Sequence, residues 1–329
     1  MLNFATFSVI LLVFLGGGYV LNDKSDYSFF DFRHTTILKG IAILLVVWGH
    51  VGKVNDVGGI QFIAGAGVSL FLICSGYGLE MSYKKSGLKD FWKKKIINVV
   101  IPFYVICIIG DFIESGFEFS WHRLLNILDF RSQWYINYLL VCYVLFWLTS
   151  KISADRKRKM FLLMGSFAIW FFIDAFFFAS GDAPFLRARQ MWAFIAGVAI
   201  ANNKDRISNL LRNKLCIFVN LIVGLGLMGV TNTSIVKGLP IIVGNVLSLG
   251  TVIPLAFAII SCSCMIKVLF KNKVLEFTGM ISYEVFLVHT YSLQLASSWI
   301  ILIPIFVILV VCISWAWNRG YGRIKKLIL

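Results

Sequence analysis

Long apolar runs separated by short polar loops extend along almost the whole chain. Their lengths lie near the ~20 residues that a helix needs to cross the hydrocarbon core of a bilayer. The pattern predicts an all-α, polytopic membrane bundle of about eleven transmembrane helices. The expected spans are roughly 2–21, 37–52, 62–83, 96–114, 133–150, 160–179, 188–202, 215–230, 239–266, 277–297 and 299–317.

Two details of the pattern affect how these spans are divided. The run 239–266 is long for one crossing and contains Pro240 and Pro254. Proline interrupts helical hydrogen bonding, so we expect this span to be tilted or kinked. Only Ser297 and Ser298 separate the last two spans.

Lysine and arginine are distributed unevenly between alternate loops. One set of loops, with the C-terminal tail, holds 25 of these residues, whereas the alternate set holds six. Basic residues collect in cytoplasmic loops of membrane proteins. With eleven spans the two sets alternate consistently, which places the N-terminus outside and the C-terminus in the cytoplasm.

The composition agrees with a membrane protein. The chain is 59% hydrophobic and 14% charged, with mean hydropathy +0.84. The net charge of +15 follows from the basic loops, so no nucleic-acid partner is expected. The seven cysteines lie in or beside apolar runs and show no metal-type spacing with histidine, so we expect reduced thiols and no metal.

The first run, 2–21, lacks a basic n-region and a small-residue cleavage site. We therefore expect a retained helix rather than a cleaved signal peptide. The predicted division is an additional N-terminal transmembrane helix with its cytoplasmic loop at 1–36, followed by one membrane domain at 37–329. All connections are short, so any activity takes place in or at the bilayer.

Ionisable side chains inside apolar spans are costly, at roughly 2.5–3.5 kcal/mol each on insertion scales, and are therefore functional candidates. Within spans these are His50, Asp174, Glu284 and His289. Arg187 or Arg189 could neutralise Asp174. Three further carboxylates lie near span ends, where an interfacial position is the simpler interpretation: Glu80, Asp111 and Glu114.

The segment "KGIAILLVVWGH" places a base at each end of an apolar run. Lys39 and His50 are 11 residues apart, which brings them within 20° of one helix face and separates them by about 16 Å along its axis. A snorkelling lysine and an interfacial histidine would show the same spacing. The pattern alone leaves both interpretations open.

Three other spans carry polar groups. Ser75 lies in the small-residue segment 67–81, which could serve close helix packing or leave room for a ligand. Tyr283 and His289 lie in 281–293, where His289 could equally be a hydrogen-bonded core residue. The segment 132–146 carries Trp134 and Tyr138, and Trp134 also suits an interfacial aromatic belt.

Five of these segments, in the same order, resemble the motifs of the acyltransferase 3 family of integral membrane O-acyltransferases. They are "LKGIAILLVVWGHV", "GVSLFLICSGYGL", "FWKKKIINVVIPFY", "WYINYLLVCYVLF" and "FTGMISYEVFLVHTY". Together they cover most of residues 37–295. Lys39 stands where the family usually has arginine, and a lysine lacks the bidentate geometry of a guanidinium. The span 2–21 is additional to the usual ten.

The resemblance implies an enzyme that moves an acyl group, often acetyl, from acyl-CoA to a hydroxyl of a cell-surface polysaccharide or its lipid-linked precursor. It implies His50 as the catalytic base or acyl relay. Lys39, Lys95 and Ser75 would bind the acyl-CoA donor. The implied pocket residues are Tyr138, His289, Tyr283 and Trp134.

Two other functions fit a helical membrane bundle with buried polar groups. One is a flippase or exporter of glycan intermediates, although the chain shows no internal repeat. The other is a membrane polymerase of glycan repeats, which would be expected to carry a large outer loop. The residue usage is typical of an AT-rich bacterial genome, so we expect the bacterial cytoplasmic membrane.

Overall fold

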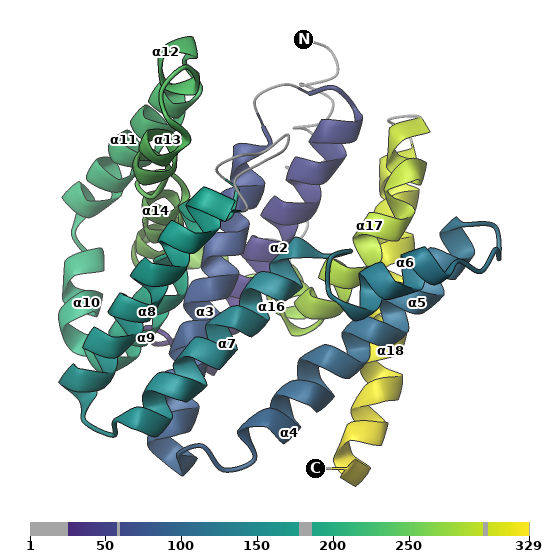
Figure 1. The fold of residues 1–329 in the computed structure, drawn as a ribbon, viewed down its shortest axis with the longest axis horizontal. Coiled ribbons are helices and arrows are strands. Elements are labelled where there is room, and N and C mark those ends of the chain that lie inside the picture. The colour runs from purple at the N-terminus through teal and green to yellow at the C-terminus, as the bar shows by residue number, and fades with distance from the viewer. Residues whose placement is uncertain (1–25, 58–59, 178–185, 299–301, 329) are drawn as a thin grey trace.

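The computed structural model describes residues 26–57, 60–177, 186–298 and 302–328, and over these residues the protein is a helical bundle without strands (Figure 1). The predicted first span, 2–21, lies outside the described residues. Eight helical stretches in the described part are long and apolar enough to cross a membrane: Phe32–Val54, Phe62–Ser86, Phe91–Glu114, Trp134–Ile152, Arg156–Phe176, Lys214–Thr231, Ile241–Met265 and Ile303–Ile328.

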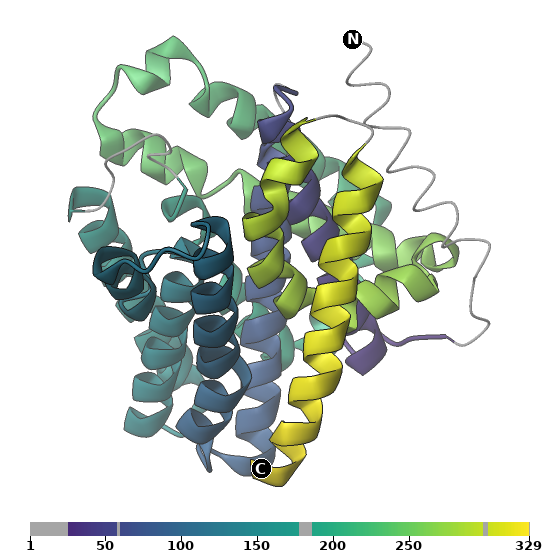
Figure 2. The same ribbon diagram turned by 90° about the vertical axis from the view of Figure 1, so that its right-hand side faces the viewer.

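The long helices are α2 (Phe32–Val54), α3 (Phe62–Ser86), α7 (Trp134–Ile152), α8 (Arg156–Phe177), α11 (Lys214–Thr231), α17 (Ser282–Ser298) and α18 (Ile303–Ile328). Between them lie α4 (Phe91–Lys95), η1 (Ile96–Val100), α5 (Ile101–Glu114), α6 (Trp121–Leu128), η2 (Ala188–Gln190), α9 (Ala193–Asn202), α10 (Lys204–Leu211), α12 (Ser234–Lys237), α13 (Ile241–Ser248), α14 (Val252–Met265), α15 (Lys267–Phe270) and α16 (Lys273–Met280). Figure 2 shows α17 and α18 running side by side.

Three predicted spans differ in detail from the helices observed. The span 239–266 is divided into α13 and α14 by a break over 249–251, in line with the expected kink. The span 188–202 contains a 3₁₀ turn and only the ten-residue α9. The span 277–297 is interrupted at Ile281, which separates α16 from α17. A helix of ten residues rises only about 15 Å, which is half of the hydrocarbon thickness.

Close helix contacts at the centre of the bundle depend on glycine. A Cβ at Gly76 of α3 would collide with the carbonyl oxygen of Phe194 in α9, and one at Gly197 of α9 would collide with the carbonyl of Ile73. The two helices therefore approach through reciprocal glycines, as in small-residue contacts between membrane helices. This contact selects the packing interpretation for Gly76.

A second pair of reciprocal glycines joins α2 to α16. A Cβ at Gly40 would collide with the carbonyl of Leu275, and one at Gly279 would collide with the carbonyl of Thr36. Gly40 directly follows Lys39 in the sequence. The close approach of α16 therefore fixes the part of α2 that carries this lysine.

A buried ion pair links α3 to α8. Lys159 Nζ lies 2.5 Å from Glu80 Oε2, and the two side chains are 2% and 3% exposed. The ammonium also lies 4.0 Å from the ring centroid of Tyr83. The Glu80 carboxylate therefore points into the bundle and is neutralised there by Lys159.

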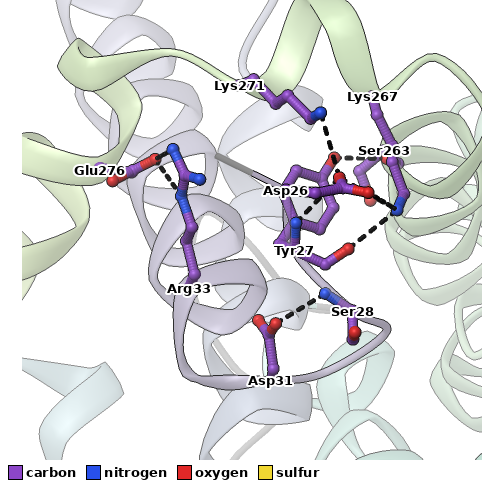
Figure 3. A network of polar contacts seen from close by, with 9 residues as sticks. All are labelled: Asp26, Tyr27, Ser28, Asp31, Arg33, Ser263, Lys267, Lys271 and Glu276. Atoms are coloured by element: carbon purple, nitrogen blue, oxygen red, sulfur yellow. Dashed lines mark hydrogen bonds and ion pairs between the residues drawn. The ribbon is translucent and has the colours of Figure 1, made fainter. Parts of the chain in front are cut away.

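The start of α2 is anchored by a polar network at the α14–α16 junction (Figure 3). Asp26 accepts a hydrogen bond from its neighbour's backbone N–H and pairs with Lys267 and Lys271, each at 3.1 Å. The Tyr27 backbone N–H and these two ammonium groups lower the pKa of Asp26 to about 2. Arg33 donates to Glu276 at 2.6 Å.

The helix itself begins with a side-chain cap. Asp31 accepts a hydrogen bond from the backbone N–H of His34 at 2.7 Å, which satisfies one of the free donors of the first turn. Together with the Asp26 network, this cap sets where α2 starts and therefore which way its polar residues face.

Some of the basic segments lie together at one end of the bundle. In Figure 1, α4, the connection between α7 and α8, and the C-terminus lie together at the bottom, whereas α12 lies at the top. Which end faces the cytoplasm stays a prediction from the charge bias.

Candidate active site

A chamber of about 650 Å³, here called the lysine chamber, lies among α2, α3, α4, α7, α17 and α18. Five residues singled out in the sequence line it: Lys39, Ser75, Lys95, Tyr283 and Glu284. They come from the consecutive helices α2, α3 and α4 and from α17, which lies near the other end of the chain. The proposed donor-binding residues are therefore brought together in one cavity.

The lysines of this chamber differ in their surroundings. Lys39 is partly exposed and makes no hydrogen bond or ion pair with a described residue. Lys95 Nζ lies 4.6 Å from the ring centroid of Tyr143, which in turn shares a 3.1 Å hydrogen bond with Ser75. A cation over an aromatic face is held in place while its remaining donors stay available to a ligand.

The C-terminal helix completes the chamber with residues that sequence reasoning did not select. Lys325 and Asn318 of α18 line it, and Asn318 donates to Glu284 Oε1 at 2.9 Å. The basic tail had served only to orient the chain, because nothing in its spacing shows that it folds back beside α2. The sequence indicates Glu284 as an ionisable group within a span, and Asn318 is its hydrogen-bond partner.

A π-helical turn shapes the wall of the lysine chamber. Pro102 has no N–H, so the carbonyl of Ile97 lacks the partner that a five-residue π register would provide. The Tyr321 hydroxyl donates to this carbonyl at 2.8 Å, and the Tyr283 hydroxyl donates to the Val99 carbonyl at 2.7 Å. These bonds bind α17 and α18 to η1, with Asn98 and Val99 lining the cavity.

A second chamber of about 980 Å³, here called the histidine chamber, contains His50, His289 and Trp134. His50 Nδ1 lies 2.8 Å from His289 Nε2, and the rings are parallel with centroids 5.1 Å apart. The two histidines come from α2 and α17, which are 239 residues apart in sequence. His289 is fully buried, whereas His50 is partly exposed to the chamber.

Several charged groups line the histidine chamber, and some of them are paired. Arg123 Nε lies 3.1 Å from Asp111 Oδ2. Arg189 also lines the chamber, and its buried Nε has no hydrogen-bond partner among the described residues. Arg187 Nε lies 3.0 Å from Asp174 Oδ1, so one of the two arginines expected to neutralise Asp174 does so.

Gln190, the residue after Arg189, is tied to α3 by two hydrogen bonds. Ser69 donates to Gln190 Oε1 at 2.6 Å, and Gln190 Nε2 donates to the carbonyl of Gly65 at 3.0 Å. Both bonds join η2 to α3. Sequence reasoning had treated Arg189 only as a partner for Asp174, because a one-dimensional pattern cannot show which of two nearby arginines faces a cavity.

Phe286 lies where the two chambers adjoin, because it lines both of them. It lies 4.8 Å from the ring of Tyr135 and 5.7 Å from that of His289, measured between centroids. On α2, Ile43 and Val46 lie between Lys39 and His50 and are each 1% exposed. The face of α2 that Lys39 and His50 share is therefore buried between them. Lys39 lines the lysine chamber, whereas His50 lines the histidine chamber.

Tyr138 is the one proposed pocket residue that lines neither chamber. It is fully buried, its ring lies 4.4 Å from that of Trp170, and its hydroxyl points at Met191 Sδ at 3.6 Å. Tyr138 packs α7 against α8 and the region after η2. In the described residues, no group of three or more His, Cys, Asp or Glu side chains could hold a metal ion.

Comparison with known protein families gives one result. A family model described as an acyltransferase domain matches residues 35–318. The match includes Lys39, His50, Lys95 and His289 but stops before Lys325. No curated protein and no solved structure shows a significant match.

Proposed function

Because the chain belongs to the acyltransferase 3 family, we propose that this multi-pass membrane acyltransferase moves an acetyl group from acetyl-CoA to a hydroxyl of a cell-surface polysaccharide or of its lipid-linked precursor. The observation that carries the proposal is the pair of adjoining chambers. One gathers cations suited to the phosphates of coenzyme A, and the other holds a histidine suited to activating a hydroxyl.

The lysine chamber supports donor binding. Lys39, Lys95 and Lys325 supply three ammonium groups around it, whereas Asp31 and Glu284 are its only carboxylates among the described residues. Ammonium groups bind phosphate as charged hydrogen-bond donors. In the proposed complex they hold the phosphates of coenzyme A, and the flexible arm directs the thioester toward Phe286.

The histidine chamber supports acceptor activation. His50 Nε2 removes the proton from the acceptor hydroxyl while the oxygen attacks the thioester carbonyl. The carbonyl carbon gains a C–O bond, and the tetrahedral intermediate then loses its C–S bond. The protonated His50 returns the proton to the departing coenzyme A thiolate, which leaves the ester, free thiol and neutral histidine.

The aromatic partition limits how the two substrates meet. Lys39 and His50 are about 16 Å apart along α2, a distance that the arm of coenzyme A can bridge only by passing the layer that contains Phe286. A rotation of this ring would join the chambers when the thioester arrives. Keeping them apart until then protects the thioester from water that enters the histidine chamber.

The test measures transfer of radiolabelled acetyl from acetyl-CoA to glycan in isolated membranes. His50→Ala should lose at least about 100-fold of the activity, because general-base catalysis contributes on the order of 10²–10⁴. His122→Ala is the matched control, since His122 lies on α6 and lines neither chamber. Full activity in the His50 variant would refute the mechanism.

Glycan analysis of a strain that lacks the gene distinguishes the proposed enzyme from the other functions. Loss of an ester mass, with chain length and export preserved, is the expected result. Loss of export would indicate a flippase, and shortened chains would indicate a polymerase. The same comparison identifies the acyl group through the mass that is lost.

A further inference from the structure

His289 makes two kinds of contact with its two ring nitrogens. Its Nδ1 lies 3.1 Å from the carbonyl oxygen of Val285 and 2.8 Å from that of Phe286. Its Nε2 lies 2.8 Å from His50 Nδ1. These contacts determine where the protons are, because a carbonyl oxygen can only accept a hydrogen bond.

The proton of His289 is therefore on Nδ1, which donates to its own helix one turn back. The ring is fully buried, and no described carboxylate forms an ion pair with it. A buried imidazolium without a counter-charge is unfavourable, so the ring is neutral and its Nε2 carries a lone pair. His289 Nε2 is then a hydrogen-bond acceptor.

The tautomer of His289 determines the tautomer of His50. Because His289 Nε2 accepts, His50 Nδ1 is the donor and carries the proton. The neutral His50 ring then has its lone pair on Nε2, and no described residue makes a hydrogen bond to that atom. His50 is partly exposed and lines the histidine chamber, where a base is required.

We propose that His289 is a positioning residue that holds His50 in the Nδ1–H tautomer, so that Nε2 is the unprotonated atom available to the acceptor hydroxyl. His289 takes the place that a carboxylate occupies behind the histidine of a catalytic triad. Being neutral, it orients the base without adding a buried negative charge. This inference rests on the proposed role of His50 as the base.

The pair also accommodates the charge that forms during the reaction. When His50 Nε2 takes the hydroxyl proton, the ring becomes an imidazolium with two donors. Its Nδ1–H then points at the His289 lone pair, so the buried donor remains hydrogen-bonded and the bond gains strength from the charge. No proton needs to leave His50 toward His289 at any step.

Other contacts hold the two helices in register around this pair. Asn55, just after α2, donates to the carbonyl of Ala296 in α17 at 2.9 Å. Gln133 donates to Thr290 Oγ1 at 3.2 Å, which ties the start of α7 to the residue after His289. The ring of Phe286 packs against His289. The acceptor atom is therefore held by its surroundings and not by His50 alone.

The chain contains an internal reference with the opposite tautomer. His34 Nδ1 accepts from the backbone N–H of Phe30 at 2.9 Å. Its Nε2 lies 2.8 Å from Ser263 Oγ, whose hydroxyl donates to the Ile260 carbonyl at 2.7 Å. His34 is therefore protonated on Nε2. The only other histidine is His122, so four rings need to be assigned.

The first experiment is nitrogen-15 NMR of histidine-labelled full-length protein in lipid nanodiscs, with single His→Gln variants to assign each ring. The expected result is a protonated, pyrrole-type Nδ1 and a bare, pyridine-type Nε2 for both His50 and His289, with the reverse for His34. A bare Nδ1 and protonated Nε2 at His50 would overturn the proposal whatever the activity.

The second experiment measures acetyl transfer by three variants at position 289. His289→Leu keeps bulk but removes the acceptor, and we expect kcat to fall about 100-fold with KM for acetyl-CoA nearly unchanged. His289→Gln can present an amide oxygen at the same place and should recover at least about tenfold of that loss. His289→Asn is shorter and should recover less.

The results separate the tautomer proposal from the proposed function. If His289→Leu keeps wild-type kcat, His289 does not position the base. If His289→Leu does not fold, the His289→Gln variant and the wild-type spectrum still decide the matter. If His50→Ala is fully active while the spectrum shows the expected tautomers, the role of His50 as base fails and the hydrogen-bond assignment stands.

Discussion

Phe286 packs against Tyr135 with 4.8 Å between ring centroids, and this contact lies where the two chambers adjoin. Phe286 precedes His289 by three residues on α17, so the proposed partition and the proposed positioning histidine share one helix turn. Any movement of this turn would affect both the passage between the chambers and the base. The following predictions test that arrangement and the packing that supports it.

Replacing Phe286 by Ala should join the two chambers. Water from the histidine chamber would then reach the thioester, so acetyl-CoA hydrolysis without acceptor should rise several-fold while transfer to glycan falls. Both rates can be measured by thiol release and by labelled transfer. Phe306→Ala is the control, because Phe306 is fully buried on α18 but lines neither chamber. Equal hydrolysis in both variants would contradict a partition role.

Changing Lys39 tests donor binding. Lys39→Ala should weaken acetyl-CoA binding about tenfold or more, since a hydrogen bond to a charged group contributes roughly 1.5–3 kcal/mol. Lys39→Arg should retain most of the affinity, because the charge remains. Calorimetry on the purified protein gives both constants. Lys93→Ala serves as the control, since Lys93 is exposed and lines neither chamber. Equal affinity in the Arg and Ala variants would remove Lys39 from the donor site.

Breaking the buried Glu80–Lys159 pair should cost stability. Lys159→Met leaves a carboxylate without its partner inside the bundle, and such losses are about 3–5 kcal/mol. The double replacement of Glu80 and Lys159 by Met should recover most of the loss. Thermal unfolding in detergent measures the difference.

An exposed ion pair provides the comparison for that experiment. Arg131 and Asp129 lie 2.8 Å apart, with side chains 77% and 40% exposed. Arg131→Met should change stability by less than about 1 kcal/mol. If Lys159→Met has an equally small effect, the Glu80 carboxylate is solvated rather than buried.

Two glycines of α3 provide a matched test of close helix packing. Gly76→Ala places a methyl group against the backbone carbonyl of Phe194, which cannot move aside like a side chain, so we expect at least about 1–3 kcal/mol of destabilisation. Gly78→Ala has nothing within 4 Å and should be neutral or slightly stabilising. Thermal unfolding in detergent compares the two, and similar losses would contradict the reciprocal contact of α3 with α9.

Much of the fold could be predicted because the bilayer restricts which structures are possible. Uninterrupted apolar runs must form helices there, since no water is present to satisfy the backbone. The limits of α3 and α7 lie close to the predicted spans for this reason. The short α9 was overestimated, because an apolar run that is buried among other helices has the same composition as one that faces lipid.

The sequence predicted several residues of the candidate site, but it did not predict which of them lie in the same chamber. His50 and His289 were singled out because ionisable groups are rare in apolar spans, and Lys39 because it shares a helix face with His50. The same reasoning could not find Lys325, which lies in a tail where basic residues are common. The family resemblance implied Tyr138 as a pocket residue, because a buried tyrosine that packs against Trp170 has the same sequence context as one that lines a pocket.

The sequence by itself determined that this protein is a helical membrane protein of the acyltransferase 3 family, and that Lys39 and His50 share one face of α2. These properties depend on local composition and helical phase. Tertiary structure alone decided that the two bases open into different chambers and that His289 is the partner of His50. Those facts depend on contacts between α2 and α17, and a pattern along one helix carries no information about the side chains that another helix brings to it.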